Sequence, residues 1–274
     1  MYVNTHFHLD DPWLKGDQRR QDVIQDIDRN HIITFAQSCS IPSYEKILSY
    51  ANQSKFIFPS FGILPWYAHE YIDRLDEVAT LCDGAMMLGE VGLDKKYAPD
   101  KACIPHQRPL FRIFLEAAEK KNMFMSLHFR GTEEEGLNLL KSYNIKKAIY
   151  HSYSGSVELM NKITDQGYFY SIGLSSLLLN RMKDDRRKFF IERVKNIPDD
   201  LLVIEIDELP TLEYFKMNFE VNSTLFPKII KAIAEIRNSS PEEIKSLCYK
   251  NVLKLIGNDP RLKNIREVCT NNGV

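Results

Sequence analysis

Residues 201–207 read Leu-Leu-Val-Ile-Glu-Ile-Asp, an apolar run that ends in a carboxylate. A continuous apolar run of this length is typical of a parallel strand that is covered on both faces. A carboxylate at the end of such a strand is costly to bury unless it is paired or coordinated. The run therefore predicts a buried parallel strand that delivers Asp207 to a site.

Seven further runs precede it, and helix-length segments with one polar and one apolar face lie between them. One such segment has apolar residues at Leu110, Phe114 and Ala118, with helical spacing. Strands that alternate with helices predict a single (β/α)₈ TIM-type barrel with parallel strands and a C-terminal helix, and a doubly wound open sheet is the alternative. The eight predicted strands are 2–6, 32–36, 56–62, 85–90, 124–128, 148–151, 168–173 and 201–206.

Helix boundaries are marked by local signals. Thr132 followed by Glu135 and Ser240 followed by Glu243 have the spacing of capping boxes, and Gly257 is placed to end the last long helix. We expect one barrel domain over residues 1–274, a length that is ordinary for this fold.

Composition narrows the function classes. The five cysteines are odd in number and form no CxxC pair, so they predict neither a disulfide framework nor a zinc finger. The formal net charge is −1, so a polyanionic substrate would be held by local charges and bound cations. No apolar run reaches the length of a membrane span, and no secretory signal is visible, so we expect a cytoplasmic protein without membrane contact.

Six potential metal ligands lie at the ends of predicted strands. Because the carboxyl ends of barrel strands converge on one face, ligands far apart in sequence become neighbours there. Side chains two residues apart on a strand point to the same side, so the first two histidines can reach one ion. The six residues are His6, His8, Glu90, His128, His151 and Asp207.

This ligand set predicts a centre with two metal ions. Imidazole and carboxylate suit zinc, manganese or iron, and carboxylate alone suits magnesium. Six ligands are too many for one catalytic ion with an open position. We therefore predict two divalent ions (Mg, Mn or Zn) that share Glu90, with Asp207 also accepting a proton from the attacking water.

The contexts of these residues resemble the signatures of the TatD-type metal-dependent deoxyribonucleases, a family of amidohydrolase-like barrels. The resemblance runs in order along the chain and includes the C-terminal segment 241–257. The matching segments are Asn-Thr-His-Phe-His-Leu-Asp (4–10), Gly-Glu-Val-Gly-Leu-Asp (89–94), Leu-His-Phe-Arg (127–130), Tyr-His-Ser-Tyr-Ser-Gly (150–155) and Val-Ile-Glu-Ile-Asp (203–207).

The resemblance implies a two-metal phosphodiester hydrolase that acts on DNA ends. It implies that Glu90 binds both ions and that Asp207 binds one of them and orients or deprotonates the water. Glu205 matches a carboxylate that receives the N–H of a ligand histidine. The first ion would be held by His6, His8, Glu90 and Asp207, and the second by Glu90, His128 and His151.

Two positions depart from the family pattern. Leu64 stands in Gly62-Ile-Leu-Pro65 where the family usually has histidine, and Ile206 replaces a threonine between the last two acids. Leu64 can neither donate to a phosphate nor coordinate a metal. The metal ligands are thus intact while the substrate-contacting rim has diverged.

Several rim residues are candidates for substrate contacts. Arg130 lies two residues after His128, so its guanidinium is expected to face the site and grip a phosphate. Lys95, in the fourth βα loop, is a weaker phosphate candidate, because a lone loop lysine is more often just solvated. Trp66 and Tyr67 would either stack a nucleobase or pack their loop against the barrel. The basic segment 181–188 favours a solvated helix face over a phosphate track.

The sequence thus predicts a divalent-metal-dependent deoxyribonuclease that cleaves single-stranded or frayed DNA, exonucleolytically. Leu64 leaves room for a second hypothesis, an amidohydrolase-like enzyme acting on an ester or C–N bond in a small molecule or aminoacyl-tRNA. A third is a subunit whose activity depends on partners in a nucleic-acid-processing assembly. Product analysis separates the first two hypotheses, because only a nuclease releases nucleotides.

Overall fold

The chain folds into a ring of eight parallel strands in the order β1 to β8, as the alternation of strands and helices predicted. The computed structural model describes residues 1–10, 14, 16–207 and 220–272. Each predicted strand is present, with boundaries that differ by a few residues. The strands are β1 (Val3–Phe7), β2 (Ile33–Gln37), β3 (Ile57–Phe61), β4 (Met87–Asp94), β5 (Phe124–Arg130), β6 (Lys147–Tyr150), β7 (Phe169–Ile172) and β8 (Leu202–Ile204).

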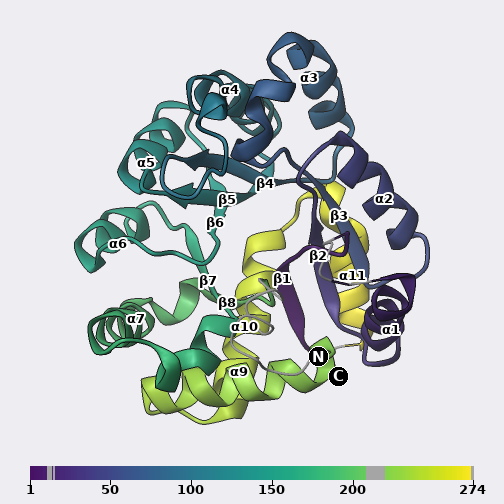
Figure 1. Cartoon of the computed structure of the whole chain (residues 1–274). Coiled ribbons are helices and arrows are strands. Elements are labelled where there is room, and N and C mark those ends of the chain that lie inside the picture. Colours follow the sequence, from purple (N-terminus) through teal and green to yellow (C-terminus); the bar gives the residue numbers. More distant parts are fainter. Residues whose placement is uncertain (11–13, 15, 208–219, 273–274) are drawn as a thin grey trace.

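Helices up to the one that ends at Arg237 surround the strands and follow one another around the ring in sequence order, and the last two lie across its far side (Figure 1). The α-helices are α1 (Gly16–Arg29), α2 (Ile41–Ala51), α3 (Leu75–Gly84), α4 (Ile104–Lys121), α5 (Glu133–Ser142), α6 (Val157–Thr164), α7 (Asp184–Asn196), α9 (Asn222–Arg237), α10 (Pro241–Ile256) and α11 (Lys263–Asn272). Short 3₁₀ helices are η1 (Pro65–Glu70), η2 (Ile72–Arg74), η3 (Lys101–Cys103), η4 (Leu174–Arg181), η5 (Asp199–Leu201) and η6 (Pro260–Leu262).

Side chains join the two ends of the sheet. Among the described residues, β1 and β8 share no backbone ladder, whereas every other neighbouring pair does. The Asn4 carboxamide accepts a hydrogen bond from the Ile206 N–H at 2.8 Å, and the Thr5 hydroxyl donates to the Ile204 carbonyl at 3.0 Å. The ring is therefore a nearly closed barrel with one seam.

Two strands run past the ends that the sequence suggested. The prediction that Glu90 ends its strand was wrong, because β4 continues to Asp94. The pairing of β4 with β5 shifts register between Leu88 and Val91, which lets the strand continue beyond an interior carboxylate. β5 likewise passes His128 and ends at Arg130. Each of these strands therefore carries two polar side chains toward the mouth of the barrel.

Glycine allows close packing of the backbone beside Glu90. A Cβ on Gly62 would lie 2.2 Å from the carbonyl carbon of Gly89, and one on Gly89 would lie 2.3 Å from the Gln37 side chain. Any larger residue would push β3 or β2 away from β4. The two glycines thus fix where the Glu90 carboxylate enters the barrel.

The helix-end signals were right in two cases of three. Ser240 and Glu243 form the predicted capping box of α10, and the Gly257 N–H bonds to the Leu253 carbonyl. The predicted box at Thr132 was wrong, because its hydroxyl donates to the Leu93 carbonyl at 2.7 Å instead of accepting from α5. That bond ties the loop after β5 to the end of β4.

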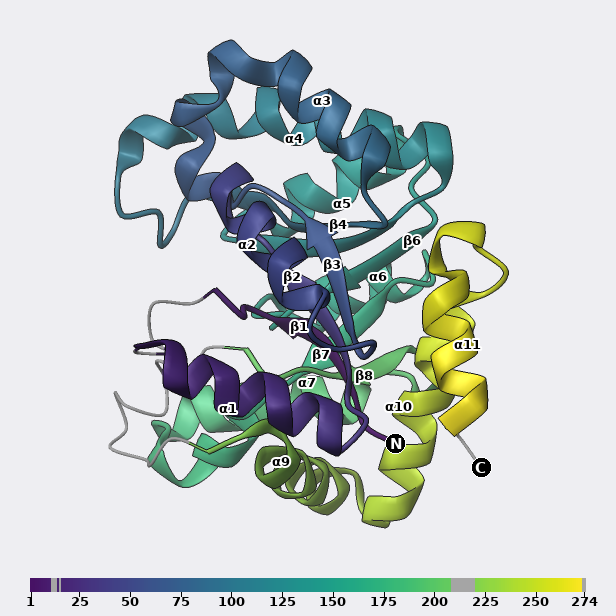
Figure 2. The ribbon, with the colours of Figure 1, turned by 90° about the vertical axis from the view of Figure 1, so that its right-hand side faces the viewer.

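The C-terminal helices lie away from the mouth. Figure 2 shows α10 and α11 on the side where β1 begins. Within the described residues, no helix is long and apolar enough to cross a bilayer.

Candidate metal centre and substrate pocket

A pocket of about 980 Å³ opens at the carboxyl ends of the strands. This volume is near the top of the range of roughly 300–1,000 Å³ that is usual for small-ligand sites. Five of the six predicted ligands line it, and the sixth, His6, is buried directly behind them. The five are His8, Glu90, His128, His151 and Asp207.

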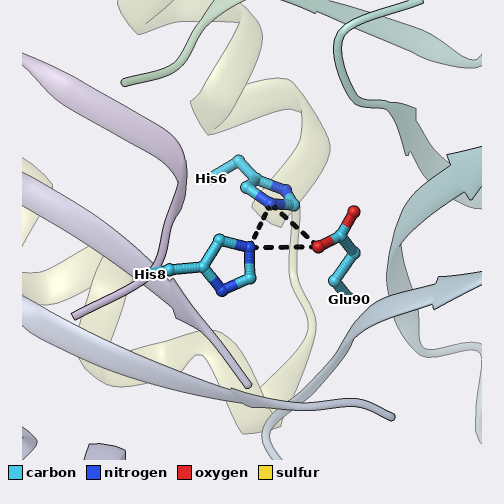
Figure 3. A group of neighbouring side chains, drawn as sticks. All are labelled: His6, His8 and Glu90. Atoms are coloured by element: carbon cyan, nitrogen blue, oxygen red, sulfur yellow. Dashed lines mark hydrogen bonds and ion pairs between the residues drawn. The ribbon is translucent and has the colours of Figure 1, made fainter. Parts of the chain in front are cut away.

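One half of the polar cluster gathers around Oε2 of Glu90 (Figure 3). This oxygen lies 3.0 Å from Nε2 of His8 and 3.6 Å from Nε2 of His6. The two imidazole nitrogens are 3.1 Å apart, so both reach one point, as their spacing in β1 predicted. These three side chains have the donors and the geometry to hold a metal ion.

The other half gathers around Oε1 of the same carboxylate. This oxygen lies 2.5 Å from Nδ1 of His128 and 2.8 Å from Nε2 of His151. The rings of His151 and His6 stack with centroids 4.1 Å apart, which packs the two halves together. Glu90, His128 and His151 form a second group that could hold a metal ion.

Outer partners fix which ring nitrogens face Glu90. The Nδ1–H of His8 donates to the Gln37 carbonyl at 3.1 Å, because a carbonyl can only accept. The Nε2–H of His128 donates to the Asp94 carboxylate at 3.0 Å for the same reason. In a neutral imidazole the other nitrogen then carries a lone pair, and here it faces a carboxylate oxygen.

Facing acceptors of this kind repel unless a cation or a proton lies between them. Nε2 of His8 faces Oε2 of Glu90 in this way, and Nδ1 of His128 faces Oε1. Imidazole nitrogens and a shared carboxylate are also the donor set that binds zinc and manganese. The residues therefore fit two divalent cations that share Glu90.

The electrostatics of the cluster favours positive charge. Burial disfavours a charged carboxylate, yet His151 and His128 hold the pKa of Glu90 well below its usual value. Burial likewise disfavours a charged imidazole, but the Glu90 carboxylate raises the pKa of His151 to about 10, against an opposing effect of Arg130. Burial lowers the pKa of His6, which keeps that ring neutral and its lone pair available.

Two acids approach His151 from the β8 side. Its buried Nδ1 has no hydrogen bond and lies 3.6 Å from Asp207 and 3.7 Å from Glu205. Asp207 is also 3.9 Å from Nε2 of His8, so it reaches both halves of the cluster. Glu205 accepts hydrogen bonds from the hydroxyls of Ser152 and Ser171. Burial opposes its charge, but His151, and to a smaller extent His6 and Ser152, lower its pKa to about 2.

Sequence reasoning missed Asp94. This buried carboxylate accepts from His128 and, at 2.7 Å, from the Trp66 indole N–H. Burial opposes its charge, but the hydrogen bonds from His128, the Tyr97 backbone and Trp66 lower its pKa to about 2. Spacing offered a signal, because residues four apart on a strand share a face and Asp94 follows Glu90 by four.

Arg130 reaches the site from the end of β5, as its spacing from His128 predicted. Its guanidinium is buried, donates to the Phe129 carbonyl at 3.0 Å and lies 3.0 Å from Nε2 of His151. No described carboxylate lies within ion-pair distance of it. A buried cation beside the cluster and on the pocket wall is placed to meet an anion.

The other rim candidates fall into two groups. Trp66, Tyr67 and Leu64 all line the pocket, and Trp66 is held by its bond to Asp94. Lys95 is half-exposed and donates to Glu135 of α5 at 2.6 Å, so its charge is already neutralised locally. Within the basic segment 181–188, Arg186 lines the pocket.

Comparison with known proteins identifies the family of the chain. The family model described as TatD related DNase matches residues 3–257. An uncharacterised metal-dependent hydrolase of Bacillus subtilis, YabD, is 25% identical over 93% of this chain and 98% of its own length. Human deoxyribonuclease TATDN3 is 24% identical over 96% of each chain.

The fold has solved counterparts. The crystal structure of YJJV, a TatD homolog from Escherichia coli, superposes with a TM-score of 0.77 over 93% of this chain and 97% of its own. At 19% identity this likeness concerns the fold alone. Because the family model spans nearly the whole chain, this protein belongs to the TatD-related DNase family of metal-dependent hydrolases.

Proposed function

We propose that this enzyme is a divalent-metal-dependent deoxyribonuclease that removes nucleotides from single-stranded or frayed DNA ends. One observation carries the proposal: each oxygen of Glu90 faces two imidazole nitrogens, and the nitrogen of His8 on one oxygen and of His128 on the other is the one left without a proton in the neutral ring. The family match and the deoxyribonuclease TATDN3 support DNA as the substrate. We further propose that residues 1–274 act as one catalytic unit.

In this proposal Glu90 holds two ions, which are Mg²⁺, Mn²⁺ or Zn²⁺. When bound, such a pair supplies a water of lowered pKa and positive charge opposite the phosphate oxygens. One ion is held by His6, His8, Glu90 and Asp207, and the other by Glu90, His128 and His151.

The chain's own groups then position the phosphate and move one proton. Arg130 binds a non-bridging oxygen of the scissile phosphate, since its guanidinium lies on the pocket wall without a described acidic partner. Asp207 accepts the proton of the attacking water, because it reaches the cluster from the open side and is partly exposed. Water oxygen bonds to phosphorus, the P–O bond breaks, and the leaving oxygen takes a proton from solvent.

The test is cleavage of end-labelled single- and double-stranded DNA with Mg²⁺, Mn²⁺, Zn²⁺ or EDTA. We expect metal-dependent release of nucleotides by the wild-type enzyme. Glu90→Gln is expected to lose more than the roughly 10–100-fold that removal of an outer partner costs, because both ions lose a ligand. Metal content measured on each purified protein separates lost binding from lost chemistry.

Glu135→Gln is the matched control. It makes the same chemical change in a rim carboxylate that pairs with Lys95 and Arg108, and it is expected to retain cleavage. A folded, metal-loaded wild-type protein that cleaves no DNA would refute the proposal. Turnover of a carboxylic ester or amide would then favour the amidohydrolase hypothesis, and activity gained only with a partner would favour the third.

A further inference from the structure

One face of α7 forms a wall of the pocket. Arg186, Phe190 and Arg193 all line it, and Met182 extends the same stripe just before the helix. Their spacings of four and three residues place them on one helix face. The sequence favoured a solvated basic helix here, but this face meets the pocket.

The two arginines of this wall have no acidic partner among the described residues. Arg193 donates from Nη1 to the carbonyls of Ser154 and Gly155, both at 3.3 Å, and uses no carboxylate. Burial lowers the pKa of Arg193 and so does the charge of Arg186, while Tyr153, Glu133 and Glu192 act in the opposite direction. Arg187, by contrast, forms an ion pair with Asp184 at 2.7 Å. Two adjacent cations that form no ion pair with a described carboxylate are placed to bind an anion between them.

The pocket floor connects this wall to the metal cluster. Arg130 stands beside His151, and the loops after β6 and β7 bring Ser152, Ser154 and Ser175 to the pocket surface. Hydroxyls and arginines are the groups that usually contact the phosphates and sugars of a nucleic-acid backbone. A basic and hydroxyl-lined path therefore leads from the cluster to α7.

The opposite wall has fewer cations than acids. Glu70 of η1 and Asp10 after β1 line that side with Trp66 and Tyr67, and Lys46 of α2 lines it as well. Carboxylates repel a phosphate, while aromatic faces accept a base. The backbone of a bound strand is thus directed toward α7, and its bases toward η1.

We propose that Arg186 and Arg193 bind the phosphate that neighbours the scissile one, so that the enzyme requires a strand with two adjacent phosphates. This inference rests on the proposed function, because it places the scissile phosphate at Arg130. The contact with a second phosphate would favour a polynucleotide over a mononucleotide ester. In this proposal α7 therefore determines substrate specificity.

The test pairs Arg186→Gln with charge-neutral linkages. Single-stranded oligonucleotides carry one methylphosphonate on the 5′ or the 3′ side of the scissile phosphate, and kcat/KM is measured for wild type and variant. For wild type we expect about a tenfold loss with one of the two linkages, the size of one charge-assisted contact. For Arg186→Gln, kcat/KM on the natural strand should fall about tenfold. The methylphosphonate to which the wild type is sensitive should cause no further fall in the variant.

A small diester, thymidine 5′-(p-nitrophenyl phosphate), isolates the centre from the wall. The loss caused by Arg186→Gln should be about tenfold greater with the oligonucleotide than with this ester. The slope of log kcat/KM against log salt should also fall by about 0.7, the value for one contact to a single strand. Arg193→Lys keeps the positive charge but loses the planar guanidinium. It should therefore also lower kcat/KM on the natural strand and reduce the effect of the same methylphosphonate.

Lys188→Gln is the matched control, because Lys188 is an exposed cation of α7 that does not line the pocket. It should behave as wild type with every substrate. The assignment of α7 would be overturned if the two methylphosphonates lowered the wild-type kcat/KM equally. It would also be overturned if the effects of the variant and of the methylphosphonate multiplied. Either result would leave the proposed nuclease activity intact. Absence of phosphodiester cleavage by wild type would instead overturn the proposed function itself.

Discussion

The centre of the barrel mouth and its α7 wall are built in opposite ways. In the centre, three of the four imidazoles have an outer partner, namely Ser126 for His6, Gln37 for His8 and Asp94 for His128. On the wall, neither arginine has a carboxylate partner among the described residues. The side chains of the centre are therefore held in place by the protein itself, whereas the arginines of the wall are free to form ion pairs with a substrate.

This contrast follows from the elements that carry each region. The centre is delivered by strands whose backbones are fixed by ladders and by close contacts at Gly62 and Gly89. Arg186 lies on a surface helix, where a long side chain is ordered only by what it binds. A preorganised centre suits chemistry, and an uncompensated wall suits recognition of a strand that differs from one turnover to the next.

The largest effect in the outer layer of the centre is expected from Asp94→Asn. The amide oxygen can still accept from His128 and Trp66, but the amide nitrogen cannot accept from the Lys96 and Tyr97 N–H groups as the carboxylate does. The negative charge that would strengthen His128 as a ligand is also gone. We expect metal affinity or activity to fall by roughly 10–100-fold. Titration of the metal-free protein with Mn²⁺ or Zn²⁺, followed by calorimetry, measures the change.

Asp259→Asn is the matched control for that substitution. Asp259 is another buried acid, but it pairs with Lys147 and Arg261 far from the mouth. Its loss should lower Tm and leave metal affinity unchanged. Equal metal affinity in wild type and Asp94→Asn would show that the outer layer is only structural, and the contrast with the wall would fail.

A second prediction concerns pH in the metal-free protein. The pKa of His151 rises from 6.5 to about 10 on folding, so its stabilisation is complete below about pH 6.5 and is lost as pH rises toward 10. The pKa values of Asp94 and Glu205 fall to about 2, so their stabilisation is present above about pH 4.5 and is lost as pH falls toward 2. The Tm of the metal-free protein should therefore decline as the pH falls below about 4.5 and as it rises above about 6.5.

Metal should reverse the alkaline side of that profile. Binding requires both His151 and His8 to lose a proton, because burial is outweighed by Cys39 and Glu90, which raise the pKa of His8 well above its usual value. Apparent affinity should therefore rise at least tenfold per pH unit between 7 and 9. Thermal melts with and without metal, run across pH 3–10, provide the measurement. A metal affinity that does not change over pH 7–9 would contradict the role of His151 as a ligand.

The smallest effect is expected from Lys95→Gln. Because Glu135 already neutralises this exposed lysine, KM for single-stranded DNA should change by no more than about twofold, as for other surface ion pairs. Glu135→Gln frees Lys95 and should lower that KM slightly. A loss from Lys95→Gln as large as that from Arg186→Gln would erase the distinction between paired and unpaired cations at the rim.

The fold and the centre could be predicted because both follow from strand periodicity. Apolar runs ending in His, Glu or Asp specify buried parallel strands, and barrel geometry then brings their polar ends together. The strand ends were less certain, since the register shift near Glu90 depends on packing between neighbouring strands. Asp94 was not predicted because it lies beyond residues 85–90, where the apolar run placed the end of the strand.

The rim resisted prediction for a different reason. A run such as Arg181–Lys188 contains both paired and unpaired cations, and sequence alone does not reveal which helix face meets the pocket. The partner of Lys95 is forty residues away, on α5. Such pairings depend on how helices sit around the ring, which local periodicity leaves open.

The seam of the barrel lies beside the proposed metal centre. His6 and His8 belong to or directly follow β1, and Asp207 lies three residues after β8, so these proposed ligands flank the one junction between described strands that has no backbone ladder. An ion coordinated by side chains from both β1 and the end of β8 would hold the two edges of the sheet together. Opening of the seam would then compete with binding, and the lifetime of the closed barrel would be set by the free metal concentration around it.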